Sequence, residues 1–473
     1  MPTAIPTTIK TTSMASATLS EQLDLVEKKY RSGITKSYTW RRNKLLQLKA
    51  LVLQHEQDIY DALYKDLHKS KEEVWATELG ILLAEINFAL KHLKAWMQPK
   101  RAGTNLVNLP SSSYIYTEPL GVVLIIGPWN YPFMLLMSPF VGALAAGNTV
   151  VLKPSEFAPA TAALLHKMIS SGFDPSEVFL VEGDGAVVVP EMMQQFTFGH
   201  VFFTGGTAIG KIIYEMAASK LVPVTLELGG KSPCVVEADA NISVAARRIA
   251  GTKFSNAGQM CIAPDYILVH ESVKDKLVLA LKKALTDFFS ANPEENENYG
   301  RIINDRQFNR LVNYLQEGHI IHGGELSAEK KYIAPTLMDQ VKAGAAVMKE
   351  EIFGPILPIL TFSSQQEALD IIAQNPNPLS FYVFTNSVSK EEAWIEAVSF
   401  GGGCVNNSSW HFANPHLPFG GRGKSGLGAA HGKASFDCFT HYKSVMKTPT
   451  WFDPSIKYPP YKGKLSLFKK LIR

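Results

Sequence analysis

The stretch LGVVLIIGPWNYPFMLLMSPFVGALAAGNTVVLKPSE, residues 120–156, decides how the chain folds. No charged residue lies between Glu118 and Lys153, and the turn GPWNYP divides the segment into two apolar runs. The run 120–127 has the length of a strand. The run 133–147 has the length of a core helix and falls short of the roughly 20 apolar residues that cross a bilayer. We therefore expect a buried strand, a functional turn and a buried helix.

Four more short, apolar, β-branched runs follow the first one, VVLII, with helical stretches between them. They are TVVLK (149–153), VFLVE (178–182), HVFFT (200–204) and PVTLEL (223–228). This alternation is typical of a parallel sheet covered by helices on both faces, which is a Rossmann-like α/β architecture. Ligands of such sheets lie at the carboxyl ends of the strands. We therefore look for chemistry in the loops GPWNYP, KPSE, EGDG, TGGTAIG and ELGGK, which end these strands.

Helices and a second α/β series flank this sheet. Residues 20–97 predict helices with apolar stripes at helical spacing. One of these stripes consists of Trp75, Leu79, Leu82, Ile86, Leu90 and Leu93. A second series of strands runs from YILVH (266–270) through YIAPTL, ILPILTF and LSFYVFT to GGCVN (402–406). We expect a second, smaller α/β domain there, joined to the first near Glu227–Lys231.

Composition and charge exclude several classes of protein. The 473 residues are enough for two or three domains. Six of the 47 basic residues lie in 457–473, where no acidic residue occurs, so the basic excess belongs to the tail and implies no nucleic-acid surface. The end of the tail, LSLFKKLIR (465–473), is too short to span a membrane. We expect an exposed basic tail, with weak contact to a membrane surface as the alternative.

The cysteines and the N-terminal residues indicate the compartment. The four cysteines contain no C-x-x-C pair, so we predict no metal site and a reduced, cytoplasmic environment. The first 20 residues carry Lys10 as their one charged side chain and lack an apolar core. We expect a disordered tail there rather than a secretory signal or a transit peptide.

The segment TGGTAIGK (204–211) comes close to a P-loop, in which Ser or Thr follows the lysine to hold Mg²⁺. Ile212 stands at that position, so we do not expect a P-loop ATPase. The segment follows a strand and opens a helix, so its backbone N–H groups could face a phosphate or a ribose. A plain strand–helix turn is the alternative.

Three polar side chains end the first two strands. Asn130 lies between two prolines and is either a turn residue or an amide donor for a developing oxyanion. Lys153 and Glu156 could bind the two hydroxyls of a ribose, one as donor and one as acceptor. A surface ion pair is the alternative for these two residues.

A carboxylate and a thiol complete the set of candidates. Glu227 lies in an apolar strand end, where burial raises a carboxyl pKa toward the range of a general base; pairing with Lys231 is the alternative. Cys261 lies in FSNAGQMCIAPDY (254–266), whose turn-like flanks fit a nucleophile better than a structural cysteine. Cys234 and Cys438 fit the structural interpretation.

Seven motifs, in order, resemble the aldehyde dehydrogenase superfamily over about residues 20–445. They are GPWNYPF, AGNTVVLKPSE, FTGGTAIGK, VTLELGGKSP, GQMCIAPDY, EEIFGP and LPFGG. The segments WNYPF, GKSPC and APDYIL resemble the class 3 branch, which acts on fatty and aromatic aldehydes. The resemblance implies oxidation of medium- or long-chain aliphatic or aromatic aldehydes to carboxylic acids with NAD or NADP, and a homodimer.

The resemblance also implies a role for each site residue. Cys261 is the nucleophile that forms a thiohemiacetal, Asn130 holds the oxyanion together with the N–H of Cys261, and Glu227 activates water to hydrolyse the thioester. The implied cofactor-binding residues are Lys153, Glu156, Thr204, Gly205, Gly206, Gly210, Leu228, Glu351 and Phe353. Lys153 and Glu156 would contact the adenosine ribose, where Glu156 should repel a 2′-phosphate, and Glu351 would contact the nicotinamide ribose.

The implied fold has two α/β domains and a small oligomerisation arm. The cofactor-binding domain would comprise 19–100 and 119–226, and the catalytic domain 227–412. Residues 101–118 and 413–445 would be the oligomerisation or bridging segments. A disordered tail (1–18) and a basic tail (446–473) would flank them.

Two other functions stay open beside this one. A CoA-acylating dehydrogenase would release its acyl group to CoA, but enzymes of that kind tend to lack the acid at Glu227. A non-catalytic nucleotide-binding relative would be expected to lose Cys261 or Glu227, and both are present. Arg422 and Lys424 depart from the family's pattern; they either favour acidic or polar substrates or belong to an exposed interface loop.

Overall fold

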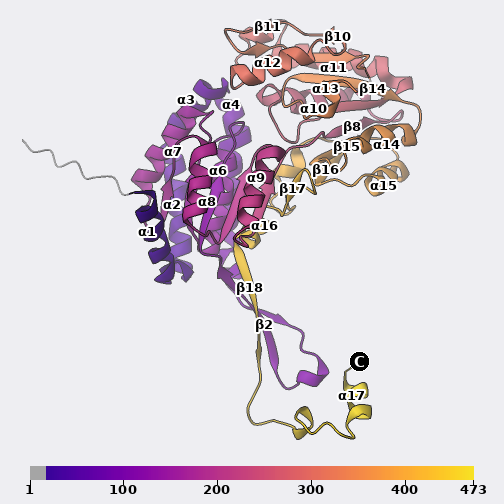
Figure 1. The fold of residues 1–473 in the computed structure, drawn as a ribbon. Coiled ribbons are helices and arrows are strands. Elements are labelled where there is room, and N and C mark those ends of the chain that lie inside the picture. The colour runs from indigo at the N-terminus through magenta and orange to yellow at the C-terminus, as the bar shows by residue number, and fades with distance from the viewer. Residues whose placement is uncertain (1–17, 343, 473) are drawn as a thin grey trace, which may run out of the picture.

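The computed structural model describes residues 18–472 except residue 343, and Figure 1 shows that they form three parts. A first α/β domain holds the N-terminal half, a second α/β domain lies beside it, and a narrow arm extends away from both. The α/β prediction is confirmed. The disordered tail expected over 1–18 lies outside the described residues, apart from Thr18, which caps the first helix.

Helices precede the first sheet, as the apolar stripes predict. They are α1 (Leu19–Arg31), α2 (Tyr38–Gln54), α3 (Glu56–Leu67), α4 (Lys71–Val74) and α5 (Gly80–Met97). A π-helical turn, Trp75–Leu79, joins the last two, and the Gly80 N–H binds the Trp75 carbonyl. The prediction that Trp75 belongs to the buried stripe is wrong, because its side chain is 43% exposed. A π turn holds more residues than an α turn, so it rotates Trp75 away from the stripe that continues along α5.

The first domain is built on a six-stranded sheet with the order β17-β7-β6-β3-β4-β5. Its strands are β3 (Val122–Ile126), β4 (Thr149–Lys153), β5 (Val178–Leu180), β6 (His200–Thr204), β7 (Val224–Glu227) and β17 (Gly426–Leu427). Strands β3 to β7 are parallel, as expected, and β17 is antiparallel to β7. The chain leaves β3 toward β4 and returns to β6 on the other side, so a topological switch lies between β3 and β6, where α/β sheets bind ligands.

Helices cover both faces of this sheet. They are α6 (Met134–Ala146), α7 (Pro159–Gly172), α8 (Gly185–Gln195) and α9 (Thr207–Ala218). All but one of the α6 residues are buried, which confirms that the uncharged stretch is a core helix. The strand register brings functional ends together: Ile126 pairs with Lys153, and Thr204 pairs with Glu227.

The second domain has a seven-stranded sheet with the order β10-β13-β14-β9-β8-β15-β16. Its strands are β8 (Pro233–Val236), β9 (Tyr266–His270), β10 (His319–His322), β13 (Thr336–Asp339), β14 (Ile356–Phe362), β15 (Ser380–Phe384) and β16 (Gly402–Val405). All pairs are parallel except β10 with β13. The helices are α10 (Ile242–Phe254), α11 (Lys274–Phe289), α12 (Asp305–Tyr314), α13 (Ala346–Lys349), α14 (Gln365–Ala373) and α15 (Val388–Ala397).

Two details of the second sheet differ from the sequence pattern. The run YIAPTL is divided between β12 (Tyr332–Ile333), which pairs with the short β11 (Leu326–Ser327), and β13. Pro335 lies at the break, since a proline cannot donate to a sheet ladder. Strand β8 was not predicted, because its four residues begin with a proline and are too few for a clear pattern.

The arm is a three-stranded antiparallel sheet of β1 (Lys100–Ala102), β2 (Ser112–Pro119) and β18 (Thr440–Lys447). Beyond β18 the chain runs to the short helix α17 (Leu465–Leu471) at the tip (Figure 1). Within the expected oligomerisation or bridging segment 413–445, β17 and α16 (Lys433–Cys438) pack on the first domain. Strand β18 begins at the end of that segment and pairs with β2 in the arm. Within residues 18–472, no helix has the length and apolarity required to cross a bilayer.

Candidate active site

A cavity of about 1300 Å³ lies between the two domains. The carboxyl ends of β3, β6 and β7 border it from the first domain, and the loops before β8 and β9 border it from the second. Nine predicted site residues line it: Asn130, Thr204, Gly205, Gly206, Glu227, Leu228, Cys261, Glu351 and Phe353. Lys153, Glu156 and Gly210 are not among the lining residues. The cavity therefore brings the three candidate catalytic side chains to one place.

Cys261 lies in the turn that connects α10 to β9 and is partly exposed to the cavity. The backbone before it is unusual, because Asn256 and Ala257 have positive φ angles of 49° and 50°. Gly258 also has a positive φ, and a Cβ there would lie 2.2 Å from the Gly354 carbonyl oxygen. These residues hold the cysteine on a tight turn against the segment 351–355. Burial, with a smaller effect of nearby carboxylates, raises the pKa of the Cys261 thiol.

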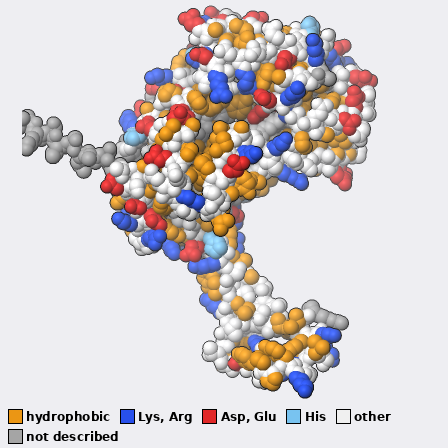
Figure 2. All heavy atoms as spheres, viewed as in Figure 1, with side chains coloured by type: hydrophobic (Ala, Val, Ile, Leu, Met, Phe, Trp, Pro, Cys, Tyr) orange, Lys and Arg blue, Asp and Glu red, His pale blue; other side chains and the backbone are white. Residues whose placement is uncertain are grey.

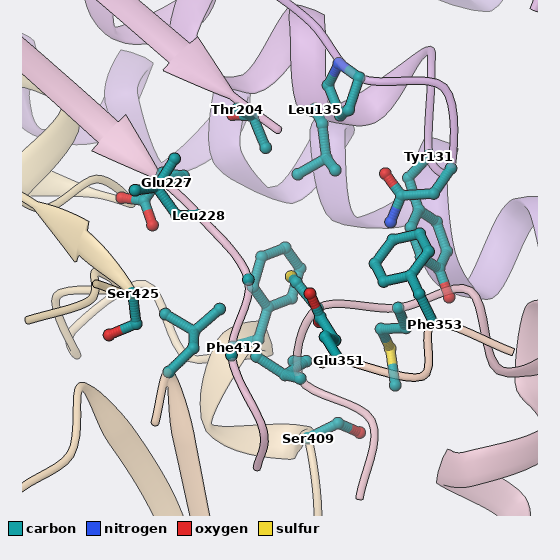
Figure 3. A pocket seen from close by; sticks show the side chains of 18 of the residues that line it. Tyr131, Leu135, Thr204, Glu227, Leu228, Glu351, Phe353, Ser409, Phe412 and Ser425 are labelled. Carbon is teal, nitrogen blue, oxygen red and sulfur yellow. The ribbon is translucent and has the colours of Figure 1, made fainter. Parts of the chain in front are cut away.

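Glu227 ends β7 with its carboxylate directed toward the cavity (Figure 3). Its side chain is buried, and neither carboxylate oxygen accepts a hydrogen bond from the described residues. Burial raises the pKa of Glu227 well above its ordinary value. The alternative of pairing with Lys231 does not occur, because the Lys231 ammonium binds Asp265 and the Val347 carbonyl (2.7 Å). Glu227 is thus a buried carboxyl with both oxygens available to a reacting group.

Asn130 follows β3 and is 3% exposed. The side-chain Nδ2 of Asn130 donates to the Gln259 carbonyl (3.0 Å). The main-chain carbonyl of Asn130 accepts hydrogen bonds from Asn256 Nδ2 (2.8 Å) and Lys69 Nζ (3.2 Å). An amide nitrogen has two N–H groups, so one is available to a ligand in the cavity. Sequence reasoning missed these three partners. Asn256 and Gln259 could have been suspected, because polar amides just before a turn cysteine must find partners when buried.

The start of α9 forms another part of the cavity wall. Gly205 and Gly206 lie between β6 and this helix. A Cβ at Gly205 would lie 2.5 Å from the Phe203 ring, whereas Gly206, the N-cap residue, faces open space. A Cβ at Gly210 would lie 2.5 Å from Leu228 Cδ2, so Gly210 lets the helix pack closely on the cavity wall. The open N-terminus of a helix with no side chain over it fits an anionic or hydroxyl-bearing cofactor group.

Lys153 and Glu156 lie at the end of β4, next to the loop before α8. Lys153 Nζ is 2.7 Å from Glu156 Oε2, and the Gly185 N–H donates to Glu156 Oε1 (3.1 Å). The ion pair that the sequence left as an alternative is thus present. Lys153 is 2% exposed, whereas the Glu156 side chain is 32% exposed. A buried ammonium beside an accessible carboxylate offers the donor and the acceptor that a ribose diol requires.

Glu351 and Phe353 cover the cavity from the second domain (Figure 3). Glu351 lies against the glycine pair after Glu227, since a Cβ at Gly229 would lie 1.8 Å from Glu351 Oε2. Burial, together with Asp265, raises the pKa of Glu351 to about 8. The Phe353 ring meets the Trp129 ring edge-on, with centroids 5.1 Å apart. Together with the α9 glycines and the Lys153 pair, these residues fit a nicotinamide dinucleotide.

The wall beside Cys261 is apolar. Ile262, Leu379 and Phe419 form a small buried cluster, and Met260, Cys261 and Phe412 pack against it. Figure 3 shows Phe412 in the middle of the cavity view and Tyr131 and Leu135 on the opposite wall. An apolar molecule could therefore lie beside the thiol with its polar end toward Asn130.

The two unusual basic residues of the late loop lie at the surface. Arg422 and Lys424 are both exposed. Lys424 lines the cavity on the side of α9, where its carbonyl accepts a hydrogen bond from Thr207 Oγ1 (3.1 Å). Arg422 is not among the cavity-lining residues, and the loop continues into β17, which pairs with β7 beside Glu227.

Known proteins resemble this chain along nearly its whole length. The aldehyde dehydrogenase family model matches residues 7–445. The 4,4′-diaponeurosporen-aldehyde dehydrogenase of Staphylococcus aureus is 47% identical over 93% of this chain and 96% of its own. Aldehyde dehydrogenase family 3 member H1 of Arabidopsis thaliana is 44% identical over 97% and 95%. The dimeric NADP-preferring aldehyde dehydrogenase of Canis lupus familiaris is 40% identical over 95% and 99%.

A solved structure agrees with these sequences. The substrate-bound state of Staphylococcus aureus AldH superposes with a TM-score of 0.94 at 45% identity and covers 97% of this chain and 100% of that one. The chain is thus an enzyme that oxidises aldehydes with NAD or NADP. It belongs to the aldehyde dehydrogenase family, within the class 3 branch.

Proposed function

We propose that the protein converts medium- or long-chain aliphatic or aromatic aldehydes to carboxylic acids through a covalent intermediate on Cys261. The observation that carries this proposal is the meeting of a thiol, a buried carboxyl without partners and an amide donor in one cavity. Cys261 Sγ gives its proton to water in the cavity and attacks the aldehyde carbon, and the carbonyl oxygen becomes an oxyanion. The free N–H of Asn130 and the backbone N–H of Cys261 bind this oxyanion, so the charge develops next to fixed donors.

The cofactor-binding residues position the second reactant. Lys153 and Glu156 would hold the adenosine ribose, Glu351 the nicotinamide ribose, and Thr204, Gly205, Gly206, Gly210, Leu228 and Phe353 would form the surrounding wall. The chemistry that bound NAD or NADP supplies is acceptance of the two electrons and the hydrogen released when the thiohemiacetal becomes a thioester. The enzyme contributes proximity, because the covalent bond to Cys261 fixes the reacting carbon.

Glu227 completes the cycle. Its carboxylate takes a proton from water, and the water oxygen attacks the thioester carbon. The C–S bond then breaks, Cys261 Sγ leaves, and the carboxylic acid is released. A carboxyl whose pKa burial has raised is a stronger base than an exposed one, which suits it to this step near neutral pH.

The first test measures the covalent step and the need for CoA together. The purified protein is mixed with a medium-chain aldehyde and NAD or NADP, and the reduced nicotinamide is followed with and without CoA. We expect turnover without CoA, and none from Cys261→Ala. Turnover that requires CoA would move the protein to the acylating branch, and activity retained by Cys261→Ala would remove the cysteine from the mechanism.

The same assay gives the cofactor preference. The Glu156 carboxylate should repel a 2′-phosphate, which favours NAD, but a class 3 relative is named NADP-preferring. We expect kcat/KM to be higher with NAD and expect Glu156→Gln to raise kcat/KM with NADP. If the ratio of kcat/KM with NAD to kcat/KM with NADP is the same in Glu156→Gln as in the parent, Glu156 does not determine the cofactor preference.

We also propose a homodimer built on the arm. The arm is narrow, yet it exposes large apolar side chains, among them Leu106 (69%) and Trp451 (77%), and Figure 2 shows an apolar patch at its tip. A second copy of the arm would cover such a surface. Light scattering should give twice the mass of one chain. Met446→Lys places a charge on the exposed face of β18, so it should lower the measured mass toward that of a single chain. A monomer that instead binds anionic vesicles through its basic tail would favour the membrane-surface alternative.

We propose further that the protein is located in the cytoplasm. All four cysteines are free thiols, as a reduced compartment favours. Fractionation of cells with an antibody against the chain tests it, and recovery in an organelle would overturn it, since an Arabidopsis relative is named chloroplastic.

A further inference from the structure

We propose that a buried ion pair, Lys69 with Glu78, acts together with Glu73 to position the oxyanion donor. The three residues belong to the N-terminal helical layer, and none of them is among the residues that line the cavity. They connect the turn that carries Asn130 to the segment that precedes Cys261. The inference rests on the oxyanion role proposed above for Asn130.

The Lys69–Glu78 pair is buried in the N-terminal helical layer, where core side chains are ordinarily apolar. Lys69 is in the turn between α3 and α4, and Glu78 is in the π turn after α4. Lys69 Nζ lies 2.7 Å from Glu78 Oε1, and both side chains are completely buried. Removing two charges from water is unfavourable, and apolar residues of similar size often stabilise such a site equally well. Stability alone therefore gives no reason for this pair.

Its remaining hydrogen bonds are directed at the turn between β3 and α6. Lys69 Nζ donates to the Asn130 carbonyl (3.2 Å) and lies 3.7 Å from the centre of the Tyr131 ring. Glu78 Oε2 accepts the backbone N–H groups of Phe133 and Met134, each at 3.1 Å. These N–H groups begin α6 and have no partner within the helix. The ion pair thus fixes both ends of the turn.

Glu73 fixes the other side of the junction. Its Oε1 accepts hydrogen bonds from Ser255 Oγ (2.9 Å) and from the Asn256 N–H (2.7 Å). Asn256 Nδ2 then donates to the Asn130 carbonyl (2.8 Å) and to the Gln259 carbonyl (3.1 Å). The Asn130 carbonyl therefore receives one donor from each side.

This arrangement determines the direction of the reactive amide. The Asn130 main chain is held by Lys69 and Asn256, and one N–H of its side chain is held by the Gln259 carbonyl. The direction of the remaining N–H follows from these contacts, because the amide is planar. A displacement of about 1 Å in such a group can cost about 10²-fold in rate.

The experiment is a double-mutant cycle between Lys69 and Asn130. Lys69→Met and Asn130→Ala are made singly and together, and kcat, KM for the aldehyde and the dissociation constant of NAD are measured. We expect Lys69→Met to lower kcat by about 10²-fold, with KM and the NAD constant within about threefold. In the Asn130→Ala background the same substitution should lower kcat less than threefold, since residues that act as one unit are not additive.

Several results would overturn the inference, and they separate it from the proposed function. An equal loss from Lys69→Met in both backgrounds would show an effect that does not pass through Asn130. A kcat within twofold of the parent would also exclude it. If Asn130→Ala itself leaves kcat unchanged, the oxyanion role fails first and this inference fails with it.

Two further variants keep the test informative if Lys69→Met does not fold. The pair Lys69→Met with Glu78→Gln leaves no lone buried charge and should show the same non-additivity with Asn130→Ala. Lys69→Arg keeps the charge and should restore part of kcat. Arg41→Met is the matched control, because Arg41 is a buried cation bonded to the Thr35 and Ala145 carbonyls, away from the turn. It should lower the melting temperature and leave kcat of the folded protein unchanged.

Discussion

Asp265 and Glu227 are both buried carboxyls at the junction of the two domains, and their contacts are opposite. Asp265 is 3% exposed, and it accepts hydrogen bonds from the Lys231 ammonium and the Ile352 N–H (3.0 Å). Glu227 is 5% exposed, and its oxygens have no donor in the described part of the chain. Buried polar groups are normally paired. The difference agrees with our proposal that the paired acid supports the site, whereas the unpaired acid takes part in the reaction.

The strongest test of this comparison is Glu227→Gln. The substitution keeps the shape but removes the base, so we expect steady-state turnover to fall by about 10²–10⁴-fold. The thiohemiacetal and the thioester should still form, so a burst of reduced nicotinamide equal to the number of sites should remain. Stopped-flow absorbance measures the burst and the steady rate in one trace. A steady rate equal to the parent's would show that another group activates the water.

The second test changes the paired acid. Asp265→Asn leaves the Lys231 ammonium buried beside a neutral amide, which should lower the free energy of unfolding by about 3–5 kcal/mol. Urea unfolding followed by fluorescence measures this change. The matched control is Asp287→Asn, which breaks an exposed pair with Lys283 and should cost about 0–1 kcal/mol. If the two substitutions lower the free energy of unfolding equally, the buried Asp265–Lys231 pair contributes no more to stability than the exposed pair.

The sequence singled out the three candidate catalytic residues that the structure brings into one cavity. Glu227 and Asn130 were candidates because each lies at the end of a recognisable apolar strand, and Cys261 was a candidate because its flanks form a turn. Lys69 and Asp265 were missed as members of the site, because their partners lie far away in the sequence and no local pattern marks a buried ion pair. Their positions depend on packing between separate segments.

The same reason explains the differences in the fold. Five parallel strands were predicted because each is a continuous apolar run between helices. Trp75 was placed in a buried stripe because the spacing assumed α-helical geometry, and a π turn changes that spacing. Strand β8 was missed because its four residues become a strand through pairing with β9 and β15.

A third test concerns the apolar wall beside Cys261. Phe412 packs on the Cys261 cluster, so Phe412→Ala should remove apolar contact with a long aldehyde and raise its KM by about tenfold. The KM for acetaldehyde, which is too short to reach far along the wall, should change less than threefold. Equal changes for the two aldehydes would indicate that Phe412 supports the cysteine rather than the substrate.

The smallest expected effect is a dependence of stability on pH. Burial raises the folded-state pKa of Glu227 above its unfolded value near 4.5, so the native state keeps a proton that the unfolded state releases as the pH rises. The unfolded state therefore becomes relatively more stable above that pH, and Glu227 weakens the fold there. Glu227→Gln should match the parent's melting temperature near pH 4.5 and exceed it by a few degrees at pH 8.

Scanning fluorimetry across this pH range decides the point, with Asp287→Asn as the control whose difference from the parent stays small throughout. The burial of Glu351 acts in the same direction, with its pKa raised to about 8, but Glu351 is present in both proteins and cancels in the comparison. A melting temperature of Glu227→Gln that lies below the parent's at pH 8 would mean that the carboxylate gains a stabilising partner. Glu227 would then resemble Asp265, and the contrast between the supporting acid and the reacting acid would be lost.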